Sequence, residues 1–115
     1  MTAITDIWFV TPLPLRDLAR ALRMTDVTAD AENYWEWIIG TLGGMTLDIT
    51  RTHTLPAAEV PTRIFRLEAP RAFAAVQQAF VAARLQQAGI TPIFLGAWVY
   101  RSGDEFELQV AETRA

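Results

Sequence analysis

The stretch Glu32–Thr50, with the sequence ENYWEWIIGTLGGMTLDIT, decides the fold that this chain can adopt. Its first half is compatible with two kinds of structure. A helix would carry Trp35 and Ile38 on one apolar stripe, because helical neighbours lie three or four residues apart. A strand would instead place Trp35 and Trp37 on one face, since side chains alternate along a strand. The choice between helix and strand therefore rests on the residues that follow.

The second half of the stretch favours a β-hairpin. Gly43-Gly44 is a signal for a two-residue turn, because glycine readily adopts the backbone angles that hairpin turns require. Met45–Thr50 then alternates apolar and polar residues, as a half-buried strand does. We therefore predict two paired strands, over residues 32–42 and 45–50. Trp35, Trp37 and Ile39 form one face of the first strand in this hairpin, and Leu47 and Ile49 supply the partner strand of that face.

The flanking sequence predicts further strands and two amphipathic helices. Strands are expected where apolar and β-forming residues concentrate, at residues 4–10, 62–68, 90–100 and 105–110. Helices are expected where apolar residues recur at helical spacing, over roughly ten residues after Pro14 and over residues 70–88. The longer helix is expected to turn an apolar stripe of Phe73, Val76, Phe80 and Ala83, widened by Val81 and Leu85, toward the core and Gln78 toward water. Gly96 is expected to mark a bulge in the strand over residues 90–100. Residues 24–30 are expected to form a polar connection. The order β-α-β-β-β-α-β-β predicts an α+β fold, an antiparallel-rich sheet with two helices packed on one face.

Length and composition indicate a single domain over residues 1–115. Apolar residues make up 51% of the chain, which excludes intrinsic disorder and predicts a well-filled core. The chain has no cysteine, so it supplies neither a disulfide nor a thiolate. No apolar run reaches the ~18–20 residues of a spanning helix, and the first residues show no signal peptide. We therefore expect a cytoplasmic protein that does not contact a membrane.

Carboxylates concentrate in two clusters of this chain, whose net charge is -3. Between Met24 and Thr50 there is no basic residue, but there are five acids: Asp26, Asp30, Glu32, Glu36 and Asp48. The second cluster, near the C-terminus, comprises Asp104, Glu105, Glu107 and Glu112. Tyr34, Trp35 and Trp37 are threaded through the first cluster, and such aromatics are enriched as anchors of protein interfaces. An acidic, aromatic face argues against a nucleic-acid partner and favours a basic protein partner.

The sequence leaves open whether Trp35 and Trp37 are core or interface. Large aromatics are more often buried, because one face of a strand must be covered. If both are buried, Tyr34, Glu36 and Ile38 would be exposed instead.

Few residues in this chain offer catalytic chemistry. There is one histidine, His53, one serine, Ser102, and no lysine. Ser102 precedes a glycine and is typical of a turn residue rather than a nucleophile. One histidine among carboxylates is a poor ligand set for zinc. Glu32 and Glu36 would point the same way on one strand, but nothing indicates the cleft that an acid–base pair needs. We therefore predict no enzyme, no metal and no cofactor.

Several short blocks resemble small bacterial immunity proteins, which accompany polymorphic or contact-dependent growth inhibition toxins. The blocks are residues 11–15 (TPLPL), 30–38 (DAENYWEWI), 47–53 (LDITRTH) and 96–100 (GAWVY). The resemblance implies a cytoplasmic, non-catalytic inhibitor that binds a cognate toxin domain and occludes its active site. Many such toxins are nucleases with basic, phosphate-binding sites, where an inhibitor's carboxylates can take the place of the phosphates.

The residue pattern and the resemblance together predict a toxin-facing surface. Its predicted members are acidic or aromatic: Asp30, Glu32, Tyr34, Trp35, Glu36, Asp104, Glu105 and Glu107. Complementary charge would speed association with a basic toxin, and a packed aromatic would slow dissociation.

Two other classes of function are compatible with the sequence. A small-molecule-binding or regulatory domain, loosely similar to ferredoxin-like modules, would line a pocket with Trp35, Arg51 and Trp98. A small hydrolase or isomerase would use Asp48, His53 and a further carboxylate. Otherwise Asp48, Arg51 and His53 are expected to form a structural polar cluster. A deep apolar pocket would favour a small ligand, and a flat acidic, aromatic face would favour a protein partner.

Overall fold

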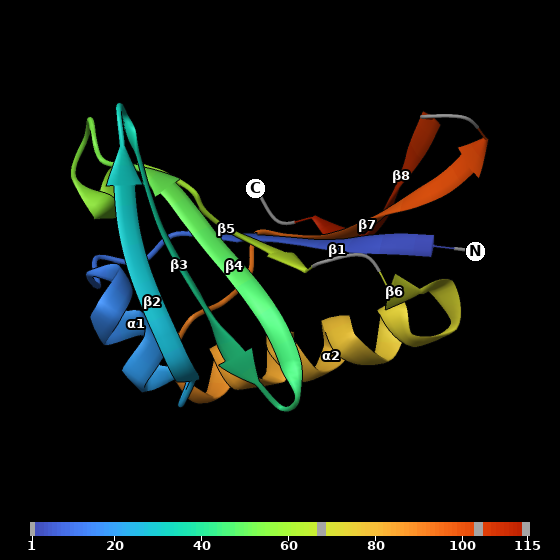
Figure 1. Ribbon diagram of the computed structural model, residues 1–115, viewed down its shortest axis with the longest axis horizontal. Coiled ribbons are helices and arrows are strands. Elements are labelled where there is room, and N and C mark those ends of the chain that lie inside the picture. Colours follow the sequence, from blue (N-terminus) through green and yellow to red (C-terminus); the bar gives the residue numbers. More distant parts are fainter. Residues whose placement is uncertain (1, 67–68, 103–104, 114–115) are drawn as a thin grey trace.

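The protein forms one antiparallel sheet with two helices packed against it (Figure 1). The computed structural model describes residues 2–66, 69–102 and 105–113. The strands are β1 (Thr2–Phe9), β2 (Thr25–Glu32), β3 (Trp35–Leu42), β4 (Met45–Thr52), β5 (Thr62–Arg66), β6 (Ala69–Pro70), β7 (Phe94–Ser102) and β8 (Glu105–Thr113). The helices are α1 (Leu15–Ala21), the short 3-10 turn η1 (Ala57–Glu59) and α2 (Arg71–Gln87). The strand order is β2-β3-β4-β5-β1-β7-β8, with β6 paired to β1. The predicted α+β fold is confirmed.

The order of elements differs from the prediction mainly at residues 24–30. This segment was predicted as a connection, but it belongs to the edge strand β2. Seven of its eight residues are exposed and only Val27 is half-buried, so β2 lacks the apolar alternation by which a strand is recognised. The β2–β3 turn is Asn33-Tyr34, where Asn33 has a φ of 54°. Asparagine tolerates this left-handed conformation better than most residues. The chain thus forms two hairpins where one was predicted.

The hairpin predicted around Gly43-Gly44 is confirmed. The predicted pairing of its faces was wrong, because Ile49 pairs with Ile38, on the face opposite Trp35, Trp37 and Ile39. Leu42 pairs with Met45 across the turn, and the two glycines have φ angles of 56° and 78°. Gly43 also lies against α2, because a Cβ at this position would be 2.7 Å from Cζ of Phe80. Glycine therefore serves both the turn and the close approach of the helix.

The core lies between the sheet and its two helices, which cover the same face (Figure 1). Fully buried residues from four strands, from both helices and from the end of α1 form it: Ile7, Phe9, Leu18, Leu22, Ile38, Leu47, Ile49, Ile64 and Leu85. Across the sheet centre, Ile38 pairs with Ile49 and Ile49 with Ile64, which builds a continuous apolar row. Neither helix, in the part of the chain that the structure describes, is long and apolar enough to cross a bilayer.

The buried stripe of α2 is rotated from the predicted one. Val76 and Phe80, predicted to face the core, are 68% and 39% exposed, whereas Val81 and Leu85 are buried. Gln78 was predicted to face water, but its Nε2 donates a hydrogen bond of 2.8 Å to the carbonyl of Gly96. The pairing of β7 with β8 is irregular at Gly96, where the sequence predicted a bulge. Helix α2 therefore turns a polar side chain toward the sheet to bind a backbone carbonyl there.

Candidate functional site: the helix-free face of the sheet

All four tryptophans of the chain lie on the sheet face opposite the helices, which we call the helix-free face. Residues paired across antiparallel strands project to the same side, so the register identifies this face. One row across it comprises Asp30, Trp37, Thr50, Arg63, Trp8 and Phe94. The next row comprises Thr28, Ile39, Asp48, Phe65, Asp6 and Gly96. Trp35 pairs with Glu32 and Thr52, and Trp98 pairs with Ile4.

Trp35 and Trp37 are not part of the core, which settles the question that the sequence left open. Trp35 is 53% exposed and Trp37 is half-buried. Ile38, the next residue of β3, points to the other face and is fully buried under the helices. The neighbouring turn residue Tyr34 is 68% exposed. Exposed aromatics therefore gather where β2, β3 and β4 meet.

Asp6 organises the centre of the helix-free face. Its carboxylate is 1% exposed and accepts two hydrogen bonds from Arg63, at 2.8 Å from Nε and 2.7 Å from Nη2. It accepts two more from the indole Nε1 atoms of Trp8, at 2.8 Å, and Trp98, at 3.1 Å. A carboxylate has about four acceptor sites, so the four donors fill the hydrogen-bonding capacity of Asp6. The Arg63 guanidinium also lies 3.8 Å from the ring centroid of Phe65.

This network has a structural role, and it was not predicted from the sequence. Its four hydrogen bonds fix the orientation of the Trp8 and Trp98 indoles and join side chains of the neighbouring strands β5, β1 and β7. One signal was available, because Asp6 is the only charged residue in the apolar stretch of residues 4–10. A buried carboxylate requires a partner, and that requirement predicts an arginine on an adjacent strand.

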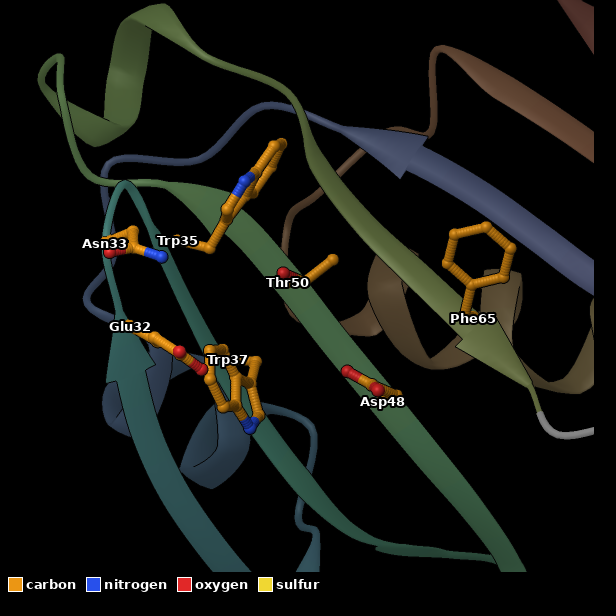
Figure 2. Close-up of a pocket in the computed structure, with 7 residues that line it drawn as sticks. All are labelled: Glu32, Asn33, Trp35, Trp37, Asp48, Thr50 and Phe65. Atoms are coloured by element: carbon orange, nitrogen blue, oxygen red, sulfur yellow. The ribbon is translucent and has the colours of Figure 1, made fainter.

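A hollow of about 500 Å³ opens on the helix-free face beside this network. It is lined by residues of β2 to β5 and of the β2–β3 turn: Glu32, Asn33, Trp35, Trp37, Asp48, Thr50 and Phe65 (Figure 2). A second hollow, of about 430 Å³, shares Trp35 and Thr50 with the first and includes Trp8, Arg51 and Arg63. The ligand-binding alternative predicted Trp35, Arg51 and Trp98 in one pocket. Trp35 and Arg51 do line this hollow, with Trp8 in the place predicted for Trp98.

Asp48 supplies a half-buried carboxylate to the first hollow. Its Oδ1 atom is buried and has no hydrogen-bond partner among the described residues. Burial raises the pKa of Asp48 above its ordinary value of 3.8, because the carboxylate loses hydration. Figure 2 shows this side chain on β4 between the indole of Trp37 and the ring of Phe65.

Asp48→Asn is expected to stabilise the protein at neutral pH. Because the folded state raises the pKa of Asp48, ionisation of this group opposes folding once the pH rises above 3.8, its ordinary value. The variant should therefore have a higher Tm than the wild type at pH 7, and the difference should shrink toward pH 3, where the carboxyl is protonated in both states. Thermal unfolding across this range measures it. The exposed Asp26→Asn removes the same charge and should leave the Tm nearly unchanged; an equal gain would contradict the role of burial.

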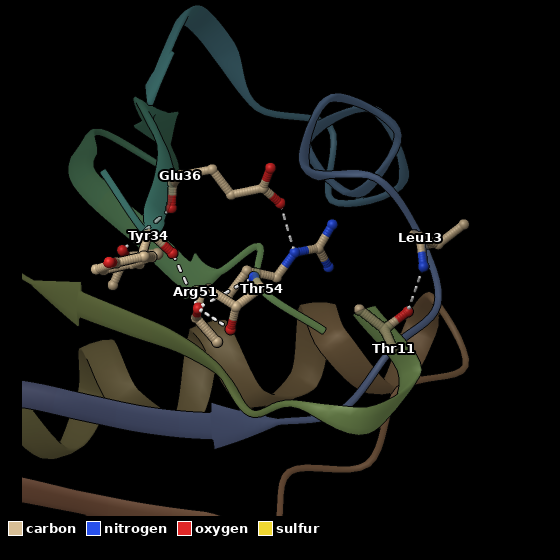
Figure 3. Close-up of polar contacts among 8 residues, drawn as sticks. Thr11, Leu13, Tyr34, Glu36, Arg51 and Thr54 are labelled. Carbon is tan, nitrogen blue, oxygen red and sulfur yellow. Dashed lines mark hydrogen bonds and ion pairs between the residues drawn. The ribbon is translucent and has the colours of Figure 1, made fainter. Parts of the chain in front are cut away.

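Glu36 lies on the helix side of the sheet, apart from Asp30 and Glu32. It pairs with Arg51 in register, and the Arg51 Nε donates a hydrogen bond of 2.8 Å to its Oε1 (Figure 3). Arg51 is 4% exposed, so this ion pair is largely covered. The prediction that Glu32 and Glu36 point the same way was wrong. The turn at Asn33 puts Glu32 on β2 and Glu36 on β3, and the pairing of these strands points the two side chains to opposite faces of the sheet.

The predicted polar cluster of Asp48, Arg51 and His53 does not form. Asp48 faces the hollow and Arg51 faces the helix side, while His53 is exposed beyond the end of β4. The backbone N–H of His53 instead donates to the carbonyl of Tyr34 at 3.0 Å, and the Thr52 hydroxyl donates to the same oxygen at 2.9 Å. These two hydrogen bonds hold the turn that carries Tyr34 against the end of β4.

Exposed acids of the two acidic clusters lie on opposite edge strands of the sheet. Asp30 and Glu32 are exposed on β2, and Glu107 is exposed on β8, with five strands between them. Asp104 and the side chain of Glu105 lie outside the described residues. Of the eight residues predicted to bind a partner, the structure brings together Asp30, Glu32, Tyr34 and Trp35.

Comparison of the chain with models of protein families, with curated proteins and with solved structures finds no match. Among the residues that the structure describes, no three His, Cys, Asp or Glu side chains gather as metal ligands would. The function is therefore inferred from the helix-free face itself.

Proposed function

We propose that this protein is a non-catalytic immunity protein that binds and neutralises a cognate toxin domain in the cytoplasm. The observation that carries the proposal is an exposed aromatic surface, rimmed by acids, on the helix-free face of β2 to β5. We call it the recognition surface and define it as Asp30, Glu32, Tyr34, Trp35, Trp37, Ile39, Asp48 and Phe65.

The apolar part of this surface is suited to anchoring a protein. Tyr34, Trp35 and Ile39 are 68%, 53% and 38% exposed, and they belong to one turn and the strand that follows it. Exposed apolar groups with a polar rim mark interaction sites. Because the aromatics project from paired strands, little backbone freedom is lost on binding, which favours tight association.

The charged part of this surface is suited to a basic partner. Asp30 and Glu32 are exposed and Asp48 lines the hollow, while the nearby Arg63 is engaged by Asp6. A surface that presents carboxylates attracts a basic partner and accelerates the encounter. A toxin domain with a phosphate-binding site, as a nuclease has, presents such a basic surface. The proposed mode of action is occlusion of that site, without contact to nucleic acid or membrane.

Glu32→Arg is expected to weaken capture of the toxin by about tenfold or more, since it places a positive charge beside a basic partner. The tagged protein would be incubated with lysate of the organism that encodes it, and retained polypeptides would be identified by mass spectrometry. Expressed alone, the retained polypeptide should stop growth, and co-expression of the wild-type protein should restore it. Co-expression of Glu32→Arg should restore it less.

The matched control is Asp17→Arg, which reverses an exposed acid on α1, away from the recognition surface. It should capture the toxin and protect growth as the wild type does. Equal loss in both variants, or a captured polypeptide that is harmless when expressed alone, would contradict the proposed function.

A further inference from the structure

The carboxylate of Asp48 has no ion-pair partner among the described residues, whereas Arg51 and Arg63 both have one. Arg51 follows Asp48 on β4 and Arg63 lies opposite Thr50 on the neighbouring strand β5; these two arginines form ion pairs with Glu36 and Asp6 at 2.8 Å and 2.7 Å. No ion pair reaches Asp48 from the described residues, and its buried Oδ1 has no hydrogen-bond donor there. A partly dehydrated carboxylate in this condition gains from any cation that enters the hollow.

The walls of the hollow favour an organic cation. Trp35 and Trp37 stand on one side of Asp48 and Phe65 on the other, and Glu32 points its carboxylate toward Trp37 (Figure 2). The faces of aromatic rings attract cations, tryptophan most strongly. A metal ion would need several oxygen or nitrogen ligands, and no three His, Cys, Asp or Glu side chains among the described residues gather to supply them.

A guanidinium fits this combination better than an ammonium. It is planar, so it can stack on a ring while it donates two hydrogen bonds to one carboxylate, and it is more weakly hydrated than an ammonium. The helix-free face already contains this arrangement, because the Arg63 guanidinium donates two hydrogen bonds to Asp6 and lies 3.8 Å from the ring centroid of Phe65.

We propose that the hollow is a binding site for an arginine side chain, with Asp48 and Glu32 as acceptors and Trp35, Trp37 and Phe65 as walls. The arginine belongs to the protein partner, so this inference rests on the proposed function and names the group that anchors the toxin. A hollow of about 500 Å³ accommodates one such side chain, inserted from the surface.

The site can be tested without the partner by titrating the protein with N-acetyl-arginine amide and following the four indole N–H signals by NMR. We expect a Kd on the order of 1–10 mM, as for a single side chain. The signals of Trp35 and Trp37 should move, whereas those of Trp8 and Trp98, which donate to Asp6, should move less. The citrulline analogue has the same shape without the charge. If it moves the Trp35 and Trp37 signals as much, the proposal is overturned.

Asp48→Asn tests the acceptor directly. It should weaken binding of the arginine amide by about tenfold or more, the effect of losing a charge-assisted hydrogen bond. Asp26→Asn, with the same change of charge outside the hollow, should bind within about twofold of the wild type. Since Asp48→Asn is expected to be more stable than the wild type, a loss of binding would not reflect unfolding. Unchanged affinity in this variant would overturn the proposal.

Two sources of guanidinium can be separated by the same titration. A capped Gly-Arg-Gly peptide imitates a side chain of a partner, whereas free arginine carries a carboxylate that Glu32 would repel. The peptide should bind more tightly, and tighter binding of free arginine would overturn the assignment to a protein partner. If these probes fail to bind but capture of the toxin still depends on Glu32, only the arginine site is refuted. If they bind but no toxin is captured, the proposed function fails instead.

Discussion

Replacing Asp6 with alanine is expected to lower the free energy of unfolding by about 3 kcal/mol, a large part of the total stability of a small domain. The change leaves a guanidinium and two indole N–H groups without their acceptor, and each buried donor that loses its partner is costly. The Arg63 side chain is 33% exposed, so water offsets part of the loss. Urea denaturation, followed by tryptophan fluorescence, measures the effect.

The control for this prediction is Asp17→Ala, which breaks an exposed ion pair with Arg20. It should cost less than about 1 kcal/mol, because water screens such a pair. Asp6→Asn should be nearly as destabilising as alanine, since its amide group turns a donor toward the Arg63 guanidinium. If Asp6→Ala is no less stable than Asp17→Ala, the network does not hold the sheet together.

Trp35→Ala is expected to reduce affinity for the toxin by about 30- to 1000-fold, which corresponds to about 2–4 kcal/mol for an aromatic anchor of an interface. The indole is 53% exposed in the free protein and lines both hollows, so its removal takes apolar contact area from the complex. The free energy of unfolding should change by less than about 1 kcal/mol, because the side chain lies outside the core. Isothermal titration calorimetry and denaturation separate the two effects.

Val76→Ala is the matched control, since Val76 is 68% exposed and lies on α2, on the other side of the sheet. It should bind the toxin as the wild type does. A loss of affinity in Val76→Ala that equals the loss in Trp35→Ala would contradict an interface specific to the helix-free face.

The sequence predicted those parts of the fold that local signals determine. Gly43-Gly44 and the alternation after it were sufficient for the β3–β4 hairpin, and helical spacing was sufficient for α2. Strand β2 was missed because an edge strand exposed to water needs no apolar alternation. The Asn33 turn was not predicted because residues 32–42 have the composition of one continuous strand.

The candidate site was less predictable because it depends on pairings distant in sequence. Strand β3 has large apolar residues on both faces, so alternation could not show whether Trp37 or Ile38 lies under the helices. The network around Asp6 joins it to Arg63, 57 residues away, and to Trp98, 92 residues away. Such contacts follow from the strand order rather than from any local pattern.

The most direct test of the proposed recognition surface is the set of indole N–H signals of the four tryptophans, recorded in the free protein and in its complex with the captured toxin. Binding through this surface predicts that the Trp35 and Trp37 signals shift and lose contact with solvent. Those of Trp8 and Trp98, held by Asp6, should keep their positions. Unchanged Trp35 and Trp37 signals in a saturated complex, with backbone changes confined to α1 and α2, would contradict binding through the recognition surface.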